Sequence, residues 1–244
     1  MSAAIDYRDR AASLTYRNKA FIDGKFVDAA SGETFECVSP VDGKLLTEVA
    51  ACDKADVDVA VKAARRAFES GVWSEMNPKD RKKALLKFAA LIEKHTDELA
   101  LLETLDMGKP ITFAVNVDVA GVVNTVQWYA EAIDKIYDEI APSDRNALAM
   151  ITREPLGVVA AVVPWNFPLL MAAWKFGPAL AAGNSVILKP AEQSPLSALR
   201  LAEIAAEAGI PDGVVNVLPG MGETAGQALG RHMDVDMVAF TGST

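Results

Sequence analysis

The chain has 244 residues, of which 51% are hydrophobic and 23% charged, as in an ordinary globular protein. Its formal net charge of −9 argues against nucleic-acid binding, which needs a basic face. No apolar run approaches the roughly 20 residues of a membrane span, and residues 1–20 lack the apolar core of a signal peptide. We therefore expect a cytoplasmic protein that handles small molecules, with neither nucleic acid nor a membrane as partner, although solubility alone would explain the charge equally well.

Residues 1–18 are typical of a loosely docked arm. Short β-prone runs on either side of Asp23-Gly24-Lys25 predict a β-hairpin. The two cysteines, Cys37 and Cys52, fit no metal-binding spacing, so we expect reduced thiols and no metal site. The two histidines have no partner in any motif and are expected to be surface residues rather than catalytic bases.

Periodic apolar residues predict a long helical stretch before the middle of the chain. Asp53 and Asn77 are candidate N-caps for the first two helices. The expected elements are a helix over 53–70, a helix from residue 78 with a break near 95–96 where Thr96 could cap its second part, a helix over 110–138, and a strand over 147–153. This strand stands outside any βαβ unit, so we expect residues 141–155 to form an oligomer contact, in an assembly of two or four chains.

The stretch over 157–192 predicts a βαβ unit. Its two apolar runs, 157–163 and 185–188, are too short for helices and read as buried parallel strands. The segment over 168–182 is long enough for the crossover helix between them. Ligands of open α/β sheets bind beyond the carboxyl ends of the strands, which here carry an amide, an indole, an ammonium and a carboxylate.

The α/β pattern continues to the last residue. Ser194-Pro195 predicts the cap of a helix that ends at Gly209, and further elements are expected as a strand over 214–218, a short helix over 225–229 and a strand over 237–240. A sheet whose last strand lacks its crossover helix would be uncovered on one face. We therefore expect these 244 residues to be a fragment of a longer protein.

Three motifs are candidates for chemistry. Asn166, held between bulky neighbours, could donate to a developing oxyanion, an effect worth roughly 3–4 kcal/mol, or it could merely bond the loop backbone. Lys189 and Glu192 could bind a ribose, where the carboxylate would disfavour a 2′-phosphate, or they could be an exposed ion pair. The glycines over 220–226 have one residue more than a dinucleotide fingerprint, and turn formation alone would explain them.

The motifs P-W-N-F-P, L-K-P-A-E-Q-S-P, N-V-L-P-G-M-G-E-T-A-G and F-T-G-S-T, in this order, resemble the aldehyde dehydrogenase superfamily over about residues 21–244. The resemblance implies an α/β fold with a Rossmann-like parallel sheet and flanking helices, preceded by a hairpin and helical segment. It also implies an incomplete NAD-binding domain over 19–140 and 156–244, with the catalytic domain absent. The stretches over 105–110 and 128–135 are similar to bacterial enzymes for γ-glutamyl-γ-aminobutyraldehyde or guanidinobutyraldehyde.

The resemblance also implies roles for individual residues around bound NAD and the aldehyde. They are Asn166 as the oxyanion donor; Val163, Pro164 and Trp165 along the nicotinamide side of the cofactor path; Lys189 and Glu192 at the adenosine ribose; Gly222 and Gly226 at the adenine end; Phe240, Gly242 and Ser243 at the pyrophosphate and nicotinamide riboside; and Trp174 and Lys175 near the substrate entrance.

In that family a cysteine thiolate attacks the aldehyde, hydride passes to NAD, and a glutamate-activated water hydrolyses the thioester. The resemblance places both residues beyond Thr244, and neither Cys37 nor Cys52 matches the nucleophile. We therefore expect a fragment of an NAD-dependent aldehyde dehydrogenase that is inactive in isolation. The alternative is a stand-alone nucleotide-binding or interaction module without catalysis.

Overall fold

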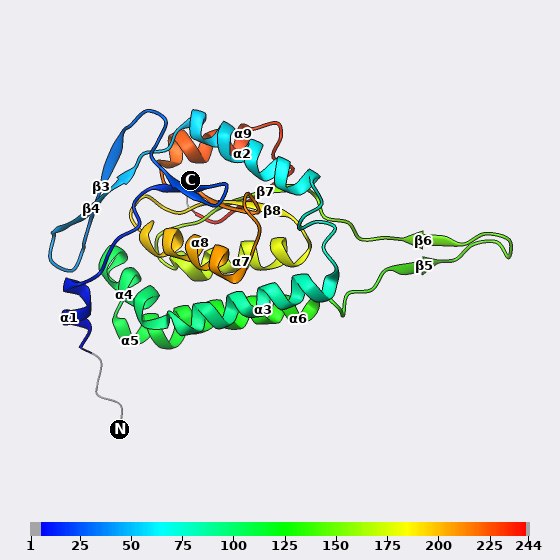
Figure 1. The fold of residues 1–244 in the computed structure, drawn as a ribbon, viewed down its shortest axis with the longest axis horizontal. Helices are drawn as coiled ribbons and strands as arrows, with labels where there is room; N and C mark the ends of the chain where they lie inside the picture. Colours follow the sequence, from blue (N-terminus) through cyan, green and yellow to red (C-terminus); the bar gives the residue numbers. More distant parts are fainter. Residues whose placement is uncertain (1–5, 243–244) are drawn as a thin grey trace, which may run out of the picture.

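The computed structural model describes residues 6–242, which form a mixed six-stranded sheet with helices on both faces (Figure 1). The strands lie in the order β10 (Met237–Phe240), β7 (Val158–Val162), β8 (Ser185–Lys189), β9 (Val215–Val217), β1 (Ala20–Ile22) and β2 (Lys25–Val27). The first four are parallel, and β1 runs antiparallel to both β9 and β2. The predicted α/β fold is confirmed, and the predicted hairpin forms one edge of the main sheet.

Side chains of the central strands alternate between two apolar cores. In β7, Val158 and Ala160 belong to the core under α2 (Lys54–Glu69), whereas Val159 and Ala161 belong to the core on the opposite face. That second core contains two layers of helices: α7 (Pro168–Ala181) and α8 (Leu196–Ala208) on the sheet, then α3 (Pro78–Lys94) and α6 (Ala120–Ala132) outside them (Figure 1). Burial on both faces explains the unbroken apolar runs of β7 and β8.

The helix starts agree in part with the predicted caps. The Asp53 carboxylate accepts from the amide of Ala55 at 2.7 Å, and Asn77 accepts from the amide of Lys79 at 3.0 Å, so both predicted caps are confirmed. The break near 95–96 is also confirmed, because α4 (Thr96–Met107) starts directly after α3. Thr96 does not cap α4, because its hydroxyl donates to the carbonyl of Glu93, three residues earlier.

None of the helices over residues 6–242 combines the length and the hydropathy of a membrane span.

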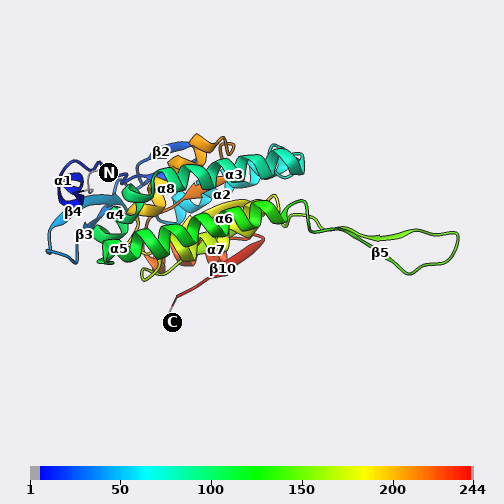
Figure 2. The same cartoon turned by 90° about the horizontal axis from the view of Figure 1, so that it is seen from below.

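The predicted helix over 110–138 is divided and shorter. It consists of α5 (Ile111–Phe113), a π-helical turn η1 (Ala114–Val119) and α6, which ends at Ala132. The chain then enters β5 (Glu139–Ala141), which pairs antiparallel with β6 (Ala149–Ile151), the strand expected over 147–153. The pairing partner of that strand was not predicted. The β5–β6 hairpin extends far from the body of the molecule in both views (Figures 1 and 2).

Five further elements complete the description of residues 6–242. A short helix α1 (Tyr7–Ala12) contacts α4 through Asp97, which accepts from Tyr7 at 2.8 Å and from Arg10 at 3.0 Å. The strands β3 (Thr34–Val38) and β4 (Leu45–Ala50) form a separate antiparallel pair. The short helix expected over 225–229 is a π-helical turn η2 (Gly222–Gly226) followed by α9 (Gln227–Arg231), which packs beside α2.

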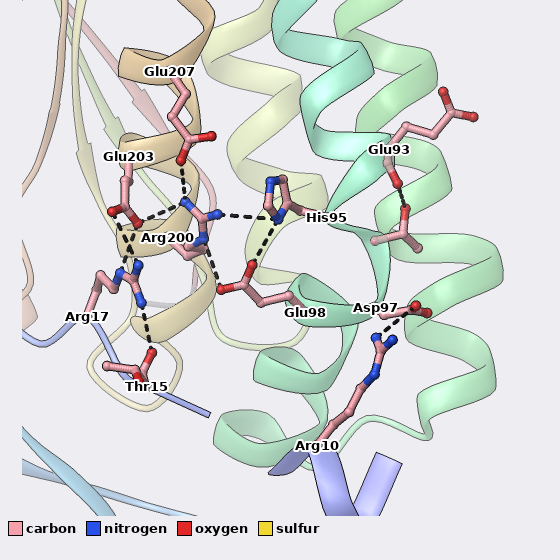
Figure 3. Close-up of polar contacts among 11 residues, drawn as sticks. Arg10, Thr15, Arg17, Glu93, His95, Asp97, Glu98, Arg200, Glu203 and Glu207 are labelled. Atoms are coloured by element: carbon pink, nitrogen blue, oxygen red, sulfur yellow. Dashed lines mark hydrogen bonds and ion pairs between the residues drawn. The ribbon is translucent and has the colours of Figure 1, made fainter. Parts of the chain in front are cut away.

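A polar network joins the N-terminal segment to α4 and α8 (Figure 3). The buried guanidinium of Arg200 contacts three carboxylates at 2.8–3.0 Å, those of Glu98, Glu203 and Glu207. His95 lies 3.0 Å from Glu98 and 3.3 Å from Arg200 through its Nδ1. The guanidinium of Arg17 binds both oxygens of Glu203, at 2.9 and 3.2 Å. His95 is therefore not the isolated surface residue that was expected, but a half-buried member of this ion network.

Two buried carboxylates of α4 accept hydrogen bonds from the amino ends of two other helices. Glu103 accepts from the amide of Leu169 at 2.9 Å, at the start of α7. Asp106, one turn further along α4, accepts from the amide of Leu196 at 3.0 Å, at the start of α8. The prediction that Ser194 caps α8 was wrong, because its hydroxyl has no hydrogen-bond partner among the described residues. A carboxylate at a helix amino terminus accepts a hydrogen bond from a free amide, and its negative charge is attracted by the positive end of the helix dipole.

Burial destabilises the charged forms of Glu103 and Asp106. Loss of hydration raises the pKa of Glu103 to about 7, against the lowering effect of the Leu169 amide, and the nearby Asp118 carboxylate also raises it. Burial likewise raises the pKa of Asp106, and the neighbouring Glu103 adds to this. The folded protein therefore holds a proton on Glu103 at mildly acidic pH that an unfolded chain would release.

This proton predicts a pH dependence of stability. An unfolded glutamate has a pKa of about 4.3. Between that value and about 7, the folded state binds more protons than the unfolded state. The contribution of Glu103 to the free energy of unfolding therefore falls with rising pH over this window, by up to about 4 kcal/mol, and is flat above it. Glu103→Gln keeps an acceptor for Leu169 but cannot titrate, so its stability relative to the unsubstituted chain should rise from about pH 4.5 to 7.5.

Urea unfolding at the two pH values measures this difference. Glu93→Gln, the same substitution at an exposed position of α3, is the matched control and should follow the unsubstituted chain. Equal pH dependence in the unsubstituted chain and Glu103→Gln would contradict a raised pKa at Glu103.

Candidate functional site

The carboxyl ends of four parallel strands lie at one level of the sheet. Val162, the last residue of β7, pairs with Lys189 of β8 on one side and with Phe240 of β10 on the other. Leu188 pairs in turn with Val217, the last residue of β9. The segments that carry the predicted motifs therefore all leave the sheet from the same edge, where ligands of open α/β sheets bind.

A cavity of about 550 Å³ opens at this edge. Trp165, Glu192 and Met221 line it from the segments after β7, β8 and β9, respectively. Its remaining wall comes from β3, the turn after it and the end of α4, through Phe35, Glu36, Cys37, Val38, Pro40, Asp106 and Met107, with Gln193 beside Glu192. Its volume lies in the range of small-molecule and cofactor sites.

Lys189 and Glu192 form a shielded ion pair beside this cavity. The Lys189 ammonium lies 3.0 Å from the Glu192 carboxylate, and the side chains are only 3% and 31% exposed. The alternative of a solvent-exposed ion pair is therefore wrong for Lys189. Partial burial acts to raise the pKa of Glu192, but hydrogen bonds from its own amide and from Lys189 outweigh this and hold it below its usual value. Glu192 is thus a charged acceptor at neutral pH.

The glycines of the segment after β9 lie close to this pair. A Cβ atom at Gly226 would be 4.0 Å from Cδ of Lys189, and no heavy atom lies within 4 Å of a Cβ atom at Gly222. Both glycines belong to η2, which starts directly after the cavity residue Met221. The surface at Gly222 is therefore open enough for a ligand to approach the backbone.

The segment between β7 and α7 presents Asn166 at the sheet edge. Asn166 and Trp165 are exposed, whereas Val163 is buried and its amide donates to the carbonyl of Lys189 at 3.1 Å. Among the described residues, no hydrogen bond engages the side-chain amide of Asn166; only its main-chain carbonyl is bonded, to the ammonium of Lys109. The alternative that Asn166 bonds the loop backbone is therefore not what the structure shows. Its amide is available to a ligand.

The other predicted residues lie around this edge. Pro164 is half-buried between Val163 and Trp165, and Phe240 is exposed at the end of β10. Gly242 lies against the ring of Phe240, since a Cβ atom there would be 2.7 Å from it. Ser243 lies outside the described residues. On α7, Trp174 is exposed and the ammonium of Lys175 donates to the hydroxyl of Thr241 at 2.6 Å, which ties α7 to the segment after β10.

Sequence reasoning missed two parts of the site. Cys37, interpreted as a bystander, lines the cavity, and burial raises the pKa of its thiol to about 12. Burial also raises the pKa of Cys52, so both thiols are protonated at neutral pH and neither is a nucleophile. Lys109, for which no individual role was predicted, contacts the Asn166 segment. No local sequence pattern marks either contact.

Among the described residues, no group of three His, Cys, Asp or Glu side chains is arranged to hold a metal ion.

Comparison with known proteins shows the family. A model of the aldehyde dehydrogenase family matches residues 26–244. The NADP/NAD-dependent aldehyde dehydrogenase PuuC of Escherichia coli (strain K12) is 57% identical over 238 residues, which are 98% of this chain and 48% of PuuC. The aminoacetaldehyde dehydrogenase of Pseudomonas aeruginosa is 57% identical over 239 residues, with the same two coverages. The chain therefore spans about half the length of the curated relatives it matches.

Solved structures agree with this match. The γ-glutamyl-γ-aminobutyraldehyde dehydrogenase from Burkholderia cenocepacia J2315 superposes with a TM-score of 0.96 at 61% identity, over 98% of this chain and 48% of that one. An indole-3-acetaldehyde dehydrogenase of P. syringae, in complex with NAD+ and IAA, gives a TM-score of 0.97 at 59% identity with the same coverages. Because the family model covers nearly all of the sequence and the fold agrees with solved members, the chain belongs to the aldehyde dehydrogenase family.

Proposed function

We propose that the protein containing this chain oxidises an aldehyde to a carboxylic acid with NAD+ as hydride acceptor. In this proposal the chain supplies the cofactor site and the oxyanion amide, while the cysteine nucleophile and the general-base glutamate lie outside residues 1–244. The observation that carries it is the shared sheet edge, where Trp165, next to Asn166, and Glu192, the partner of Lys189, line one cavity. Among the described residues, the side-chain amide of Asn166 has no hydrogen bond. The names of the relatives support the same reaction, since all are aldehyde dehydrogenases.

The site residues fit the cofactor on chemical grounds. The Lys189 ammonium can donate to a ribose hydroxyl while the Glu192 carboxylate accepts from another. Gly222 and Gly226 leave room for close approach, and Val163, Pro164 and Trp165 border the path toward Asn166. Phe240, Gly242 and Ser243 would border the pyrophosphate and nicotinamide riboside. Trp174 and Lys175 would support the substrate side. NAD+ would supply the hydride acceptor, and the protein residues orient it.

The role of Asn166 can be tested in the full-length protein that carries these residues. Asn166→Ala removes a donor aimed at the developing negative charge on the aldehyde oxygen. We expect kcat for NADH formation to fall about 100- to 1000-fold, with little change in NAD+ affinity. The matched control is Asn124→Ala, at an exposed position of α6, which should keep full activity.

The outcomes also separate the two functional candidates. Binding of NAD+ without NADH formation from any aldehyde by the unsubstituted full-length protein would favour a nucleotide-binding module over an enzyme. NADH formation by the isolated 244-residue chain would contradict the assignment of the nucleophile to a part of the protein beyond it.

A substitution at Glu192 tests the proposed preference for NAD+ over NADP+. Its carboxylate repels the 2′-phosphate of NADP, and Glu192→Gln removes that repulsion while it keeps an acceptor. We expect the preference for NAD+ over NADP+ in kcat/KM to narrow about tenfold, equivalent to about 1.4 kcal/mol. Glu69→Gln, at the exposed end of α2, is the control. An unchanged preference would remove Glu192 from the ribose site.

The β5–β6 hairpin supports an assembly of two or four chains. Its strands project from the body, and Ile140, Leu148 and Met150 are 73%, 68% and 60% exposed (Figure 2). Projecting apolar strands with free edges commonly pair with a second chain. We infer that residues 141–155, together with β5, form this contact. The Ile140→Asp, Met150→Asp double variant should lower the mass measured by analytical ultracentrifugation, and an unchanged mass would contradict the inference.

The names of the relatives support a proposal for the substrate class. Two of those compared act, by name, on aminoacetaldehyde and γ-glutamyl-γ-aminobutyraldehyde, and the stretches over 105–110 and 128–135 resemble enzymes of this kind. An aldehyde derived from an amine, such as γ-glutamyl-γ-aminobutyraldehyde or guanidinobutyraldehyde, is therefore the proposed substrate. A cytoplasmic location stays a prediction; the buried free thiols Cys37 and Cys52 are compatible with a reducing compartment.

A further inference from the structure

Lys109 is a nearly buried lysine that contacts the Asn166 segment at two points. Its side chain is 7% exposed, and its ammonium donates to the main-chain carbonyl of Asn166 at 2.9 Å. The same ammonium lies 3.8 Å from the centre of the Phe167 ring, a cation–π contact. Lys109 is not among the residues that line the cavity, so it contacts the segment from outside the cavity wall.

Asp118 compensates the charge of Lys109. Its side chain is fully buried in the π-helical turn η1, and one carboxylate oxygen lies 2.7 Å from the Lys109 ammonium, as an ion-pair contact rather than an aligned hydrogen bond. An unpaired ammonium would be costly at this depth, so the pair makes the buried donor possible. The Lys109 ammonium has hydrogens that Asp118 does not engage, and it donates one of them to the main-chain carbonyl of Asn166.

The segment is thereby held on both sides of its turn. Lys109 holds the carbonyl of Asn166, and Glu103 holds the amide of Leu169, three residues later. Pro164 and Pro168 restrict the backbone on either side of Trp165-Asn166-Phe167. These constraints leave open the torsions of Trp165 and Asn166, among them the one that turns the peptide plane after Asn166. The bond from Lys109 to the carbonyl in that plane fixes it.

We propose that Lys109 is the positioning residue for Asn166: its ammonium, charge-compensated by Asp118, fixes the main chain so that the Asn166 amide points to the reacting aldehyde oxygen. This rests on the proposed function of Asn166 as oxyanion donor. Lys109 does not line the cavity, and we assign it no catalytic role. Its effect comes through direction alone, and a displacement of about 1 Å at a catalytic group can cost about 100-fold in rate.

A double variant separates positioning by Lys109 from its role in stability. Lys109→Met alone would leave the Asp118 carboxylate buried without a partner, and Asp118→Asn alone would leave the Lys109 ammonium unpaired at the same depth, so either change could unfold the protein. The double variant Lys109→Met, Asp118→Asn removes both charges together with the Lys109 contacts to Asn166 and Phe167. The reference is the unsubstituted protein, and the same comparison in an Asn166→Ala background isolates the effect on the Asn166 amide.

The kinetic test uses the full-length protein. Relative to the unsubstituted protein, the double variant should lose about 10- to 100-fold in kcat, with the aldehyde KM and the NAD+ Kd unchanged within about twofold. In an Asn166→Ala background, the same comparison should show a loss below about threefold, because no amide remains to be positioned. Equal losses in both backgrounds, or no loss in either, would overturn the proposal.

A second measurement is independent of activity. Hydrogen–deuterium exchange of the Trp165, Asn166 and Phe167 amides in the full-length protein should be faster in the double variant than in the unsubstituted protein, with α4 and α7 unchanged. Unchanged exchange over these three residues would overturn the proposal. If the unsubstituted full-length protein forms no NADH from any aldehyde, the proposed function fails, and the exchange result then decides whether Lys109 holds the segment.

Discussion

The amino ends of α7 and α8 are both held by carboxylates from a single turn of α4, and the geometry of the candidate site depends on this. The segment with Asn166 runs from β7 to α7, and the segment with Glu192 runs from β8 to α8. At one end, each segment is fixed by the parallel register of the sheet. At the other, it is fixed by a hydrogen bond to Glu103 or Asp106. Burial of two carboxylates is the energetic cost, visible in their raised pKa values.

Local patterns were sufficient to predict most of the main sheet. The βαβ unit, the hairpin at Gly24, the caps at Asp53 and Asn77 and the break before Thr96 each follow from residues within a few positions of one another. What local patterns could not provide was partners distant in sequence. The strand β5 was not predicted, since only its pairing with β6 distinguishes it. The cap of α8 comes from Asp106, 90 residues earlier.

The same division applies to the candidate site. Lys189 and Glu192 are three residues apart after a recognisable strand, and the structure joins them as the spacing predicted. The wall formed by Cys37 and its neighbours depends on where the β3–β4 pair lies against α4, which no motif encodes. Lys109 and Asn166 are 57 residues apart, and their contact requires the end of α4 to lie under the edge of the sheet.

The π-helical turn η1 places Asp118 opposite Lys109, and this has a consequence for insertions and deletions. Such a turn accommodates one residue more than an α-helical turn. Removal of a single residue between Ala114 and Asp118 would restore regular α-helical winding, which advances by about 100° per residue. Asp118 and α6 both follow the removed position, so they would move together: either the carboxylate leaves the ammonium, or α5 shifts against α4. Sequence length in this short segment is therefore constrained by charge neutrality in the interior as well as by the packing of the helices around it.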